Sequence, residues 1–316
     1  MKSKYISKIS IGQVETLYPL ATIFKGARPM SYGIALAGGG CRGAAHVGVL
    51  LALEENNMLP SSIAGASAGG IVAGLYASGF SIQKMKELIL DPTQTGYHLL
   101  DADLWGMAKA FCQMAMHRPV TFTGLVKGNA LEKMFYDLTG GCHIREAKMR
   151  VVIPAVDLNS GRTIAYTNSL HDLSHLEQVR WRNDVLLCEA MRASSAYPSF
   201  FQPKKIGKMC LVDGGLTHNL PVDLLIAGGE KKVLAVDIGE AYQKMEQENV
   251  VEIVSHSLNI MRIRLLECSA SGEELTVQPD LPPGAGLLTF NLMGECMEAG
   301  YRATIKMLPL IKNTFF

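Results

Sequence analysis

Apolar residues in the first third of the chain recur with two different periods. Short continuous apolar runs at Tyr32–Ala37 and Ser62–Ala64 predict buried strands. Each run is followed by a turn and then by a stretch of helical spacing, Ala44–Glu55 after the first run and Gly70–Ser78 after the second. The pattern therefore predicts two successive strand–turn–helix units.

The same alternation continues to the end of the chain. We expect helices at Ser81–Leu90, Leu131–Leu138, Asp184–Arg192, Val250–Leu266 and Cys296–Leu308, and strands at Met149–Val156, Arg162–Thr167, Met209–Val212 and Lys232–Ile238. Asn129 is placed to cap the helix near Leu131. This alternation predicts an α/β fold with a largely parallel sheet and helices on both faces. Since no repeat or linker interrupts it, we expect one domain at residues 31–316 after an amino-terminal arm at residues 1–30.

The stretch Leu99–Phe122 is rich in large apolar side chains but contains no candidate catalytic motif. Two interpretations are open for it. In the first, the apolar residues form a lid or an acyl groove, because flexible methionine side chains can adapt to different acyl chains. In the second, they belong to an ordinary buried helix. We expect the second, which is simpler. The apolar residues are Leu99, Leu100, Leu104, Trp105, Met107, Phe111, Met114 and Met116.

Composition and charge exclude several classes of protein. Of the 316 residues, 48% are hydrophobic and 19% are charged, which is typical of a soluble globular protein. A net charge of +1 gives no general attraction to nucleic acid. The seven cysteines have no regular spacing and form no CxxC pair or Cys/His cluster. We therefore expect buried thiols in a reducing compartment, no metal site and no cofactor.

We expect neither a membrane span nor a signal peptide. No apolar run reaches the roughly 18 residues of a transmembrane helix, and Met1–Met30 lacks the apolar core of a signal peptide. A solvated arm is expected there, with weak attraction to an anionic membrane as the alternative. These features predict a cytoplasmic protein with at most peripheral membrane contact, and they leave its oligomeric state open. The charges of the segment are Glu15 against Lys2, Lys4, Lys8, Lys25 and Arg28.

The first turn is rich in glycine and carries one arginine. Such a turn between a strand and a helix presents backbone N–H groups to an anion. It matches neither G-x-x-x-x-G-K-[ST] nor G-x-G-x-x-G, which argues against a nucleotide site. The amides of Gly39, Gly40 and Cys41 are the candidate oxyanion donors, while the arginine either locks the loop, as we expect, or pairs with a phosphate. The turn consists of Gly38, Gly39, Gly40, Cys41, Arg42 and Gly43.

The second turn has the form G-x-S-x-G, which holds a serine on a sharp strand-to-helix bend. Its glycines relieve crowding at the bend, and the following helix directs its positive end toward the serine. A serine hydroxyl becomes a useful nucleophile only with a base and with donors for the oxyanion. The turn consists of Gly65, Ala66, Ser67, Ala68 and Gly69.

The candidate base is Asp213, which ends the predicted strand Met209–Val212 and precedes Gly214 and Gly215. A carboxylate at the carboxyl end of a strand points into the crevice where α/β sheets bind ligands. On local grounds alone, a turn or helix cap explains this aspartate equally well.

Three histidines are rival bases. His46 falls on the apolar face of a predicted helix, and His218 lies only five residues after the aspartate at position 213. His256 lies in the long helix predicted at Val250–Leu266. None of the three is flanked by a motif comparable with Asp-Gly-Gly.

Together the motifs resemble those of the patatin-like phospholipases. The family signature of a G-G-G-x-R-G turn, a G-x-S-x-G serine and a D-G-G/A aspartate corresponds to Gly38–Gly43, Gly65–Gly69 and Asp213–Gly215. The blocks Ala193–Pro198 and Asp213–Pro221 are similar as well. The likeness spans most of the chain, from Tyr32 to the carboxy-terminal helix.

This resemblance implies a catalytic dyad of Ser67 and Asp213, a three-layer fold related to cytosolic phospholipase A2, and hydrolysis of lipid acyl esters without a metal. One position of the glycine turn is a thiol, Cys41, which either fills a small apolar space, as we expect, or makes the enzyme sensitive to thiol reagents. Two other functions stay open: a Ser-His-Asp esterase, and a lipid-binding or regulatory protein with a little-used site.

Overall fold

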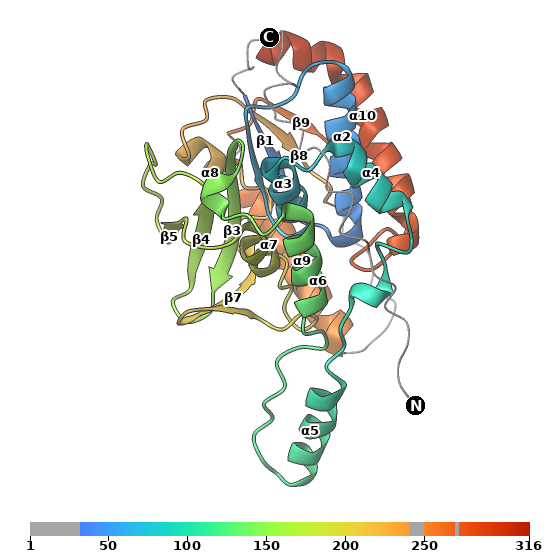
Figure 1. The fold of residues 1–316 in the computed structure, drawn as a ribbon, viewed down its shortest axis with the longest axis vertical. Helices are drawn as coiled ribbons and strands as arrows, with labels where there is room; N and C mark the ends of the chain where they lie inside the picture. The colour runs from blue at the N-terminus through green and yellow to red at the C-terminus, as the bar shows by residue number, and fades with distance from the viewer. Residues whose placement is uncertain (1–31, 240–249, 269–271) are drawn as a thin grey trace.

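The computed structural model describes residues 32–239, 250–268 and 272–316 (Figure 1). Within them one nine-stranded sheet is covered by helices. The strands are β1 (Gly33–Leu36), β2 (Ser62–Gly65), β3 (Arg150–Asp157), β4 (Arg162–Thr167), β5 (Val179–Arg182), β6 (Lys204–Ile206), β7 (Met209–Asp213), β8 (Val233–Val236) and β9 (Leu275–Val277). The α-helices are α2 (Ala44–Glu55), α3 (Ala68–Ser78), α4 (Ile82–Leu90), α5 (Leu104–Ala115), α6 (Asn129–Thr139), α7 (Leu187–Ser194), α8 (Val222–Ala227), α9 (Val250–Cys268) and α10 (Met293–Phe315).

The sheet is largely parallel, as expected. Its main path is β5-β4-β3-β2-β1-β8-β9, in which β3, β2, β1, β8 and β9 run parallel to one another. β4 returns antiparallel to β3, and β7 pairs antiparallel with β3 near its carboxyl end and with β6 on its other side. The central strands therefore end at one common edge of the sheet, where the two predicted turns lie.

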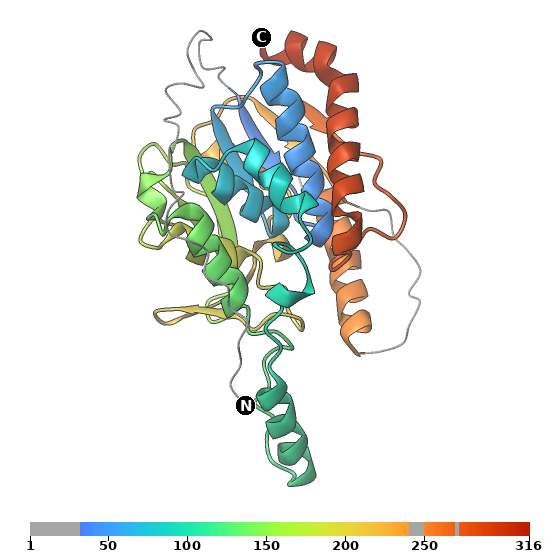
Figure 2. The ribbon, with the colours of Figure 1, turned by 45° about the vertical axis from the view of Figure 1, so that its right-hand side comes forward.

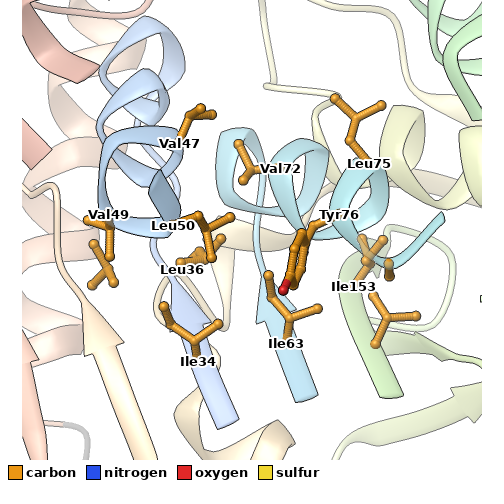
Figure 3. Close-up of a cluster of buried hydrophobic side chains, with 14 of the residues drawn as sticks. Ile34, Leu36, Val47, Val49, Leu50, Ile63, Val72, Leu75, Tyr76 and Ile153 are labelled. Carbon is orange, nitrogen blue, oxygen red and sulfur yellow. The ribbon is translucent and has the colours of Figure 1, made fainter. Parts of the chain in front are cut away.

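Each central strand is apolar on both faces but with different side-chain sizes. Large residues such as Ile34 and Ile63 point toward α2 and α3, where they pack in the main core (Figure 3). Small residues such as Ala35 and Ala64 point to the other face, where they pack with α8. Alternation along a strand sends successive side chains to opposite faces. The outcome is a sheet between two helical layers, as the sequence predicts.

The short elements around the site match their expected ranges closely, and the differences have local causes. α2 covers the expected Ala44–Glu55, whereas α3 already begins at Ala68. Asn129 does not cap α6, because the carboxylate of Asp101 accepts hydrogen bonds from the amides of Gly128 and Asn129. That cap comes from a residue 28 positions away, which local sequence does not reveal.

The expectation of a buried helix within Leu99–Phe122 is wrong. A helix forms there, α5, but Trp105 is 79% exposed and Phe111 is 70% exposed. Both views show α5 projecting beyond the body of the domain (Figures 1 and 2). The predicted arm at residues 1–30 lies outside the described residues, so the boundary with the 31–316 domain stays a prediction.

Candidate active site

The two predicted turns lie side by side because β1 and β2 are adjacent and parallel. Leu36 pairs with Gly65 at the end of this ladder. Asp213 reaches the same level through β3, since it pairs with Ala155, three positions beyond the residue of β3 that pairs with Ala64. Register alone therefore places the aspartate level with the serine turn.

Ser67 sits on a strained bend between β2 and α3. Its backbone has φ 51° and ψ −120°, a conformation that L-residues rarely adopt and that is concentrated at functional sites. Its Oγ donates a hydrogen bond to Oδ2 of Asp213 at 2.6 Å, and its carbonyl accepts the amide of Ile71 at 3.0 Å. The bend thus turns the hydroxyl away from the helix and toward the carboxylate.

Gly69 and Gly65 are needed for this bend because backbone passes close to both. A Cβ at Gly69 would lie 2.3 Å from the carbonyl oxygen of Leu36, and one at Gly65 would lie 2.1 Å from the carbonyl oxygen of Gly69. The motif therefore contributes close packing of α3 on the sheet, in addition to positioning the serine.

A second serine, Ser194 at the end of α7, supports the bend from behind. Its Oγ accepts a hydrogen bond from the amide of Ser67 at 3.0 Å, and the side chain is fully buried. Two residues on, the carbonyl of Ala196 accepts the amide of Asp213 at 3.0 Å. The block Ala193–Pro198 therefore contacts both members of the pair. The family likeness marked this block, but no residue pattern indicated what it contacts.

Asp213 is buried, with 3% of its surface exposed. Its Oδ2 accepts the Ser67 hydroxyl and its Oδ1 accepts the amide of Gly215 at 2.7 Å. Burial raises the pKa of this carboxyl from 3.8 to about 6, and the two hydrogen bonds act in the opposite direction. Gly214 follows directly, where a Cβ would lie 2.1 Å from the carbonyl oxygen of Pro154.

The glycine turn at Gly38–Gly43 faces the same space, but its amides differ in availability. Gly38 donates to the carbonyl of Asn219 at 3.0 Å, and Cys41 donates to the carbonyl of Gly286 at 3.1 Å. In the part of the chain that the structure describes, the amides of Gly39 and Gly40 donate to no carbonyl outside their own turn. The expectation that the Cys41 amide is an available donor is therefore wrong, while the other two remain candidates.

Two further residues of this turn have structural surroundings. Arg42 donates from Nε to the carbonyl of Gly39 at 3.1 Å, as expected of a residue that locks the loop. Cys41 is 6% exposed, and burial raises the pKa of its thiol to about 12. A neutral, buried thiol favours the space-filling interpretation over reactivity.

None of the three rival histidines hydrogen-bonds to Ser67 or Asp213 among the described residues. His46 is fully buried, its Nε2 is 2.8 Å from the carbonyl oxygen of Ala37, and burial lowers its pKa to about 4. His218 lies between Thr163 and Asp223, whereas His256 lines the cavity described next.

A cavity of about 840 Å³ opens at the serine and the aspartate, within the range of small-molecule sites. One wall is α9, which the sequence predicted as a helix without assigning it to the site. Asn219 also lines the cavity, and its buried Nδ2 has no hydrogen-bond partner among the described residues. The lining from α9 and the loops includes Tyr197, Leu216, His256, Leu258, Met261, Arg262, Arg264, Leu265 and Leu287.

Neither a metal site nor a membrane span is found in the described residues. No group of three or more His, Cys, Asp or Glu side chains in them is arranged to hold a metal ion. Likewise, none of the helices described is both long and apolar enough to cross a membrane.

Curated relatives match the chain at modest identity. Lysophospholipase NTE1 of Debaryomyces hansenii is 28% identical over 216 residues, which is 66% of this chain but 12% of that protein. Neuropathy target esterase sws of Drosophila melanogaster is 30% identical over 213 residues, 66% of this chain and 13% of that protein. The uncharacterized protein YqhO of Bacillus subtilis is 28% identical over 228 residues, 68% of this chain and 73% of its own. The chain thus spans only a small part of the first two relatives.

Solved structures match more of the chain at lower identity. VipD from Legionella pneumophila aligns with a TM-score of 0.48 and 15% identity over 90% of this chain and 67% of its own. Human GIVD cytosolic phospholipase A2 aligns with a TM-score of 0.42 and 14% identity over 93% of this chain and 60% of its own. The model of the family described as patatin-like phospholipase matches residues 34–226, which is more than half of the chain and includes the positions of all three motifs. The chain therefore belongs to the patatin-like phospholipase family.

Proposed function

We propose that this protein is a serine acyl hydrolase that cleaves ester bonds of phospholipids or related lipids. Family membership supports a lipid ester hydrolase. The observation that carries the finer proposal is the 2.6 Å hydrogen bond from Ser67 Oγ to Asp213 Oδ2 at the cavity. A nucleophile and a base in hydrogen-bond contact are what acyl transfer requires.

In the proposed reaction Ser67 Oγ attacks the ester carbonyl carbon while its proton passes to Asp213 Oδ2. The C=O π electrons move onto oxygen, and the amides of Gly39 and Gly40 donate hydrogen bonds to that oxyanion. Collapse of the tetrahedral intermediate breaks the C–O bond of the alcohol, which takes the proton from the aspartic acid. The serine is left as an acyl ester.

Water then completes the cycle by the same steps in reverse order. Asp213 removes a proton from water, the hydroxide attacks the acyl ester, and the oxyanion again faces Gly39 and Gly40. Breaking the ester returns the proton to Ser67 Oγ and releases the fatty acid. An oxyanion donor of this kind is worth roughly 3 kcal/mol of transition-state stabilisation.

The burial of Asp213 suits this role. A carboxylate with an ordinary pKa is a weak base at neutral pH, whereas one raised to about 6 accepts a proton more readily and still ionises at pH 7. No imidazole is needed for proton transfer in this scheme, which favours the dyad over a Ser-His-Asp triad.

The cavity lining suggests the substrate. Leu258, Met261 and Leu265 of α9 give an apolar wall for an acyl chain, and Arg262 and Arg264 of the same helix bring positive charge to the cavity. Guanidinium groups pair well with phosphate. We therefore propose glycerophospholipids reached from a membrane surface, and the relatives named lysophospholipase make monoacyl lipids the first to test.

The test uses purified wild type, Ser67→Ala, Asp213→Asn and His256→Ala, each with a lysophospholipid, a diacyl phospholipid and a water-soluble short-chain ester. Fatty acid release by wild type should drop by about 10⁴-fold in the first two variants and persist in His256→Ala. Full activity in Ser67→Ala contradicts the proposal. Activity that survives Asp213→Asn but not His256→Ala favours the triad, and lipid retention without release by wild type favours a binding protein.

A further inference from the structure

Residues 101–127, which we call the α5 arm, leave and rejoin the domain at neighbouring points and carry α5 at their tip (Figures 1 and 2). Large apolar side chains of the arm are exposed to an extent unusual for a surface helix. The exposed fractions are 72% for Leu104, 79% for Trp105, 44% for Met107, 70% for Phe111, 59% for Met114, 59% for Met116 and 48% for Val120. Large contiguous apolar patches on a protein mark an interaction site.

The apolar residues form a stripe on one side of α5. Leu104, Met107, Phe111 and Met114 follow a spacing of three and four, which places them on one helix face. The opposite side is covered by the returning segment, since the amide of Thr121 donates to Oε1 of Gln113 at 3.0 Å. The stripe therefore lies on the side of the helix away from Gln113 and from the segment that hydrogen-bonds to it.

The base of the arm is fixed to the domain. Asp103 donates its amide to the carbonyl of Leu125 at 2.8 Å and accepts Nε2 of Gln202 at 2.8 Å. Val126 donates to the carbonyl of Phe200 at 2.9 Å and accepts the amide of Gln202 at 2.8 Å. These bonds hold both ends of the arm against the segment that follows Tyr197, so the exposed stripe has a defined position relative to the cavity.

The base of the arm is also continuous with the cavity lining. Val126, Phe200 and Phe201 form a small buried cluster. Tyr197 and Leu287 pack against this cluster and also line the cavity. Tyr32, just before β1, stacks on Phe315 near the C-terminus, marked at the top of Figure 1. The carboxyl edge of the sheet therefore faces downward in that view, the direction in which α5 projects.

The charge of the arm narrows the choice of partner. No Asp or Glu occurs between Leu104 and Leu131, whereas Lys109 and Arg118 are exposed on the arm. An apolar helix face flanked by Trp and by basic residues fits the interfacial region of an anionic bilayer. The alternative partner is a second copy of this chain whose own arm packs against the stripe. That arm has no acidic residue between Leu104 and Leu131 to pair with these cations.

We propose that the α5 arm docks the protein on anionic lipid bilayers, with Leu104, Met107, Phe111 and Met114 inserted among the acyl chains and with Trp105, Lys109 and Arg118 at the level of the headgroups. Docking in this way presents the cavity to the lipid surface. The inference rests on the proposed function for its purpose, because a bilayer is where such an enzyme meets its substrate. Its binding step needs no catalysis and is tested separately.

Binding is measured in the Ser67→Ala background so that the vesicles stay intact. The probes are vesicles of phosphatidylcholine alone and of phosphatidylcholine with phosphatidylglycerol. The chain has two tryptophans, and Trp181 is half-buried in the core under the sheet. We expect the fluorescence emission of Trp105 to shift to the blue on the anionic vesicles. Lipids brominated on their acyl chains should quench that emission.

Three variants separate the contributions. Trp105→Gln/Phe111→Gln should lower vesicle affinity by more than about tenfold, which is measured for all variants by co-sedimentation with the vesicles because this variant lacks the fluorescent Trp105. Lys109→Gln/Arg118→Gln should lower it on anionic vesicles by about fivefold for each charge and hardly change it on neutral ones. The matched control is Leu310→Gln, which removes another half-exposed apolar side chain, at 50%, from α10 near the opposite end of the domain. It should bind as the parent does.

Several results overturn the proposal. Absence of vesicle binding by the parent does so, as does equal binding by the Trp105→Gln/Phe111→Gln variant. A concentration-dependent dimer that this variant abolishes, without vesicle binding, shows that a second copy covers the stripe. With Ser67 intact, the Trp105→Gln/Phe111→Gln variant should still hydrolyse a soluble short-chain ester. Failure of the proposed function would remove that activity from wild type as well, so failure of docking and failure of the proposed function are distinguishable.

Discussion

Replacement of Asp213 by asparagine tests whether burial governs this carboxylate. The side chain is 3% exposed, and burial raises its pKa from 3.8 to about 6. In the unfolded chain the carboxyl ionises near its ordinary value. Between the two values the folded protein therefore binds more protons than the unfolded chain, and its stability falls as the pH rises through this window.

The size of the effect follows from the shift. A difference of about 2 pKa units corresponds to about 3 kcal/mol of destabilisation once the pH is well above 6. Asparagine has nearly the same shape, keeps an oxygen for the amide of Gly215 and carries no charge. We therefore expect Asp213→Asn to be more stable than wild type, by a margin that grows by about 1.5 kcal/mol between about pH 5 and pH 8.

The assay is urea denaturation at constant ionic strength across this pH range. Asp184→Asn is the control, because the hydrogen bond from Arg182 lowers the pKa of Asp184. A lowered pKa contributes stability that is present above the ordinary value and is lost only at lower pH, so the control difference should stay constant. A pH-independent difference for Asp213→Asn, or a variant less stable than wild type throughout, would refute the reasoning.

Three further predictions concern the site. In wild type, kcat/KM for a soluble ester should fall about tenfold per pH unit below about pH 6, because protonated Asp213 accepts no proton. A kcat/KM that stays constant to about 1.5 pH units below this pKa argues against Asp213 as the base. Ser194→Ala should lower kcat about tenfold or more, because it releases the Ser67 amide. Ser195→Ala should not, because the Ser195 hydroxyl bonds to the carbonyl of Arg192 instead, and equal effects of the two variants would show that Ser194 does not position Ser67. Ser67→Gly should exceed Ser67→Ala in unfolding free energy by about 1 kcal/mol, since only glycine adopts φ 51° without strain; equal stabilities in urea would show that the bend stores no strain.

The local part of the fold could be predicted from the sequence. Glycines mark both turns, and the helix at Ala44–Glu55 has the predicted ends. Ser67 and Asp213 are 146 positions apart in the sequence. Their contact depends on the antiparallel register of β7 with β3. Its place at a strand end made this aspartate the candidate base, but on local grounds a turn or helix cap explained it equally well, and the family likeness implied the dyad with the serine.

Other features were outside the reach of residue patterns. The hydroxyl of Ser194 and the amide of Asn219 meet the site through tertiary packing. Both lie in blocks that the family likeness marked, but the residues of those blocks do not indicate what they contact. The apolar stripe of α5 follows helical spacing, yet that spacing does not tell whether protein or another apolar phase covers it. The buried helix expected there was wrong for this reason.

The central claim is that Ser67 is an activated nucleophile, and a fluorophosphonate probe tests it most directly. Wild type, Ser67→Ala, Asp213→Asn and the control Ser195→Ala are incubated with the probe, and the modified peptide is identified by mass spectrometry. The account predicts one adduct, on Ser67, in wild type and in Ser195→Ala, with much slower labelling in Asp213→Asn and none in Ser67→Ala. An adduct on another serine, or undiminished labelling of Ser67→Ala, would contradict it.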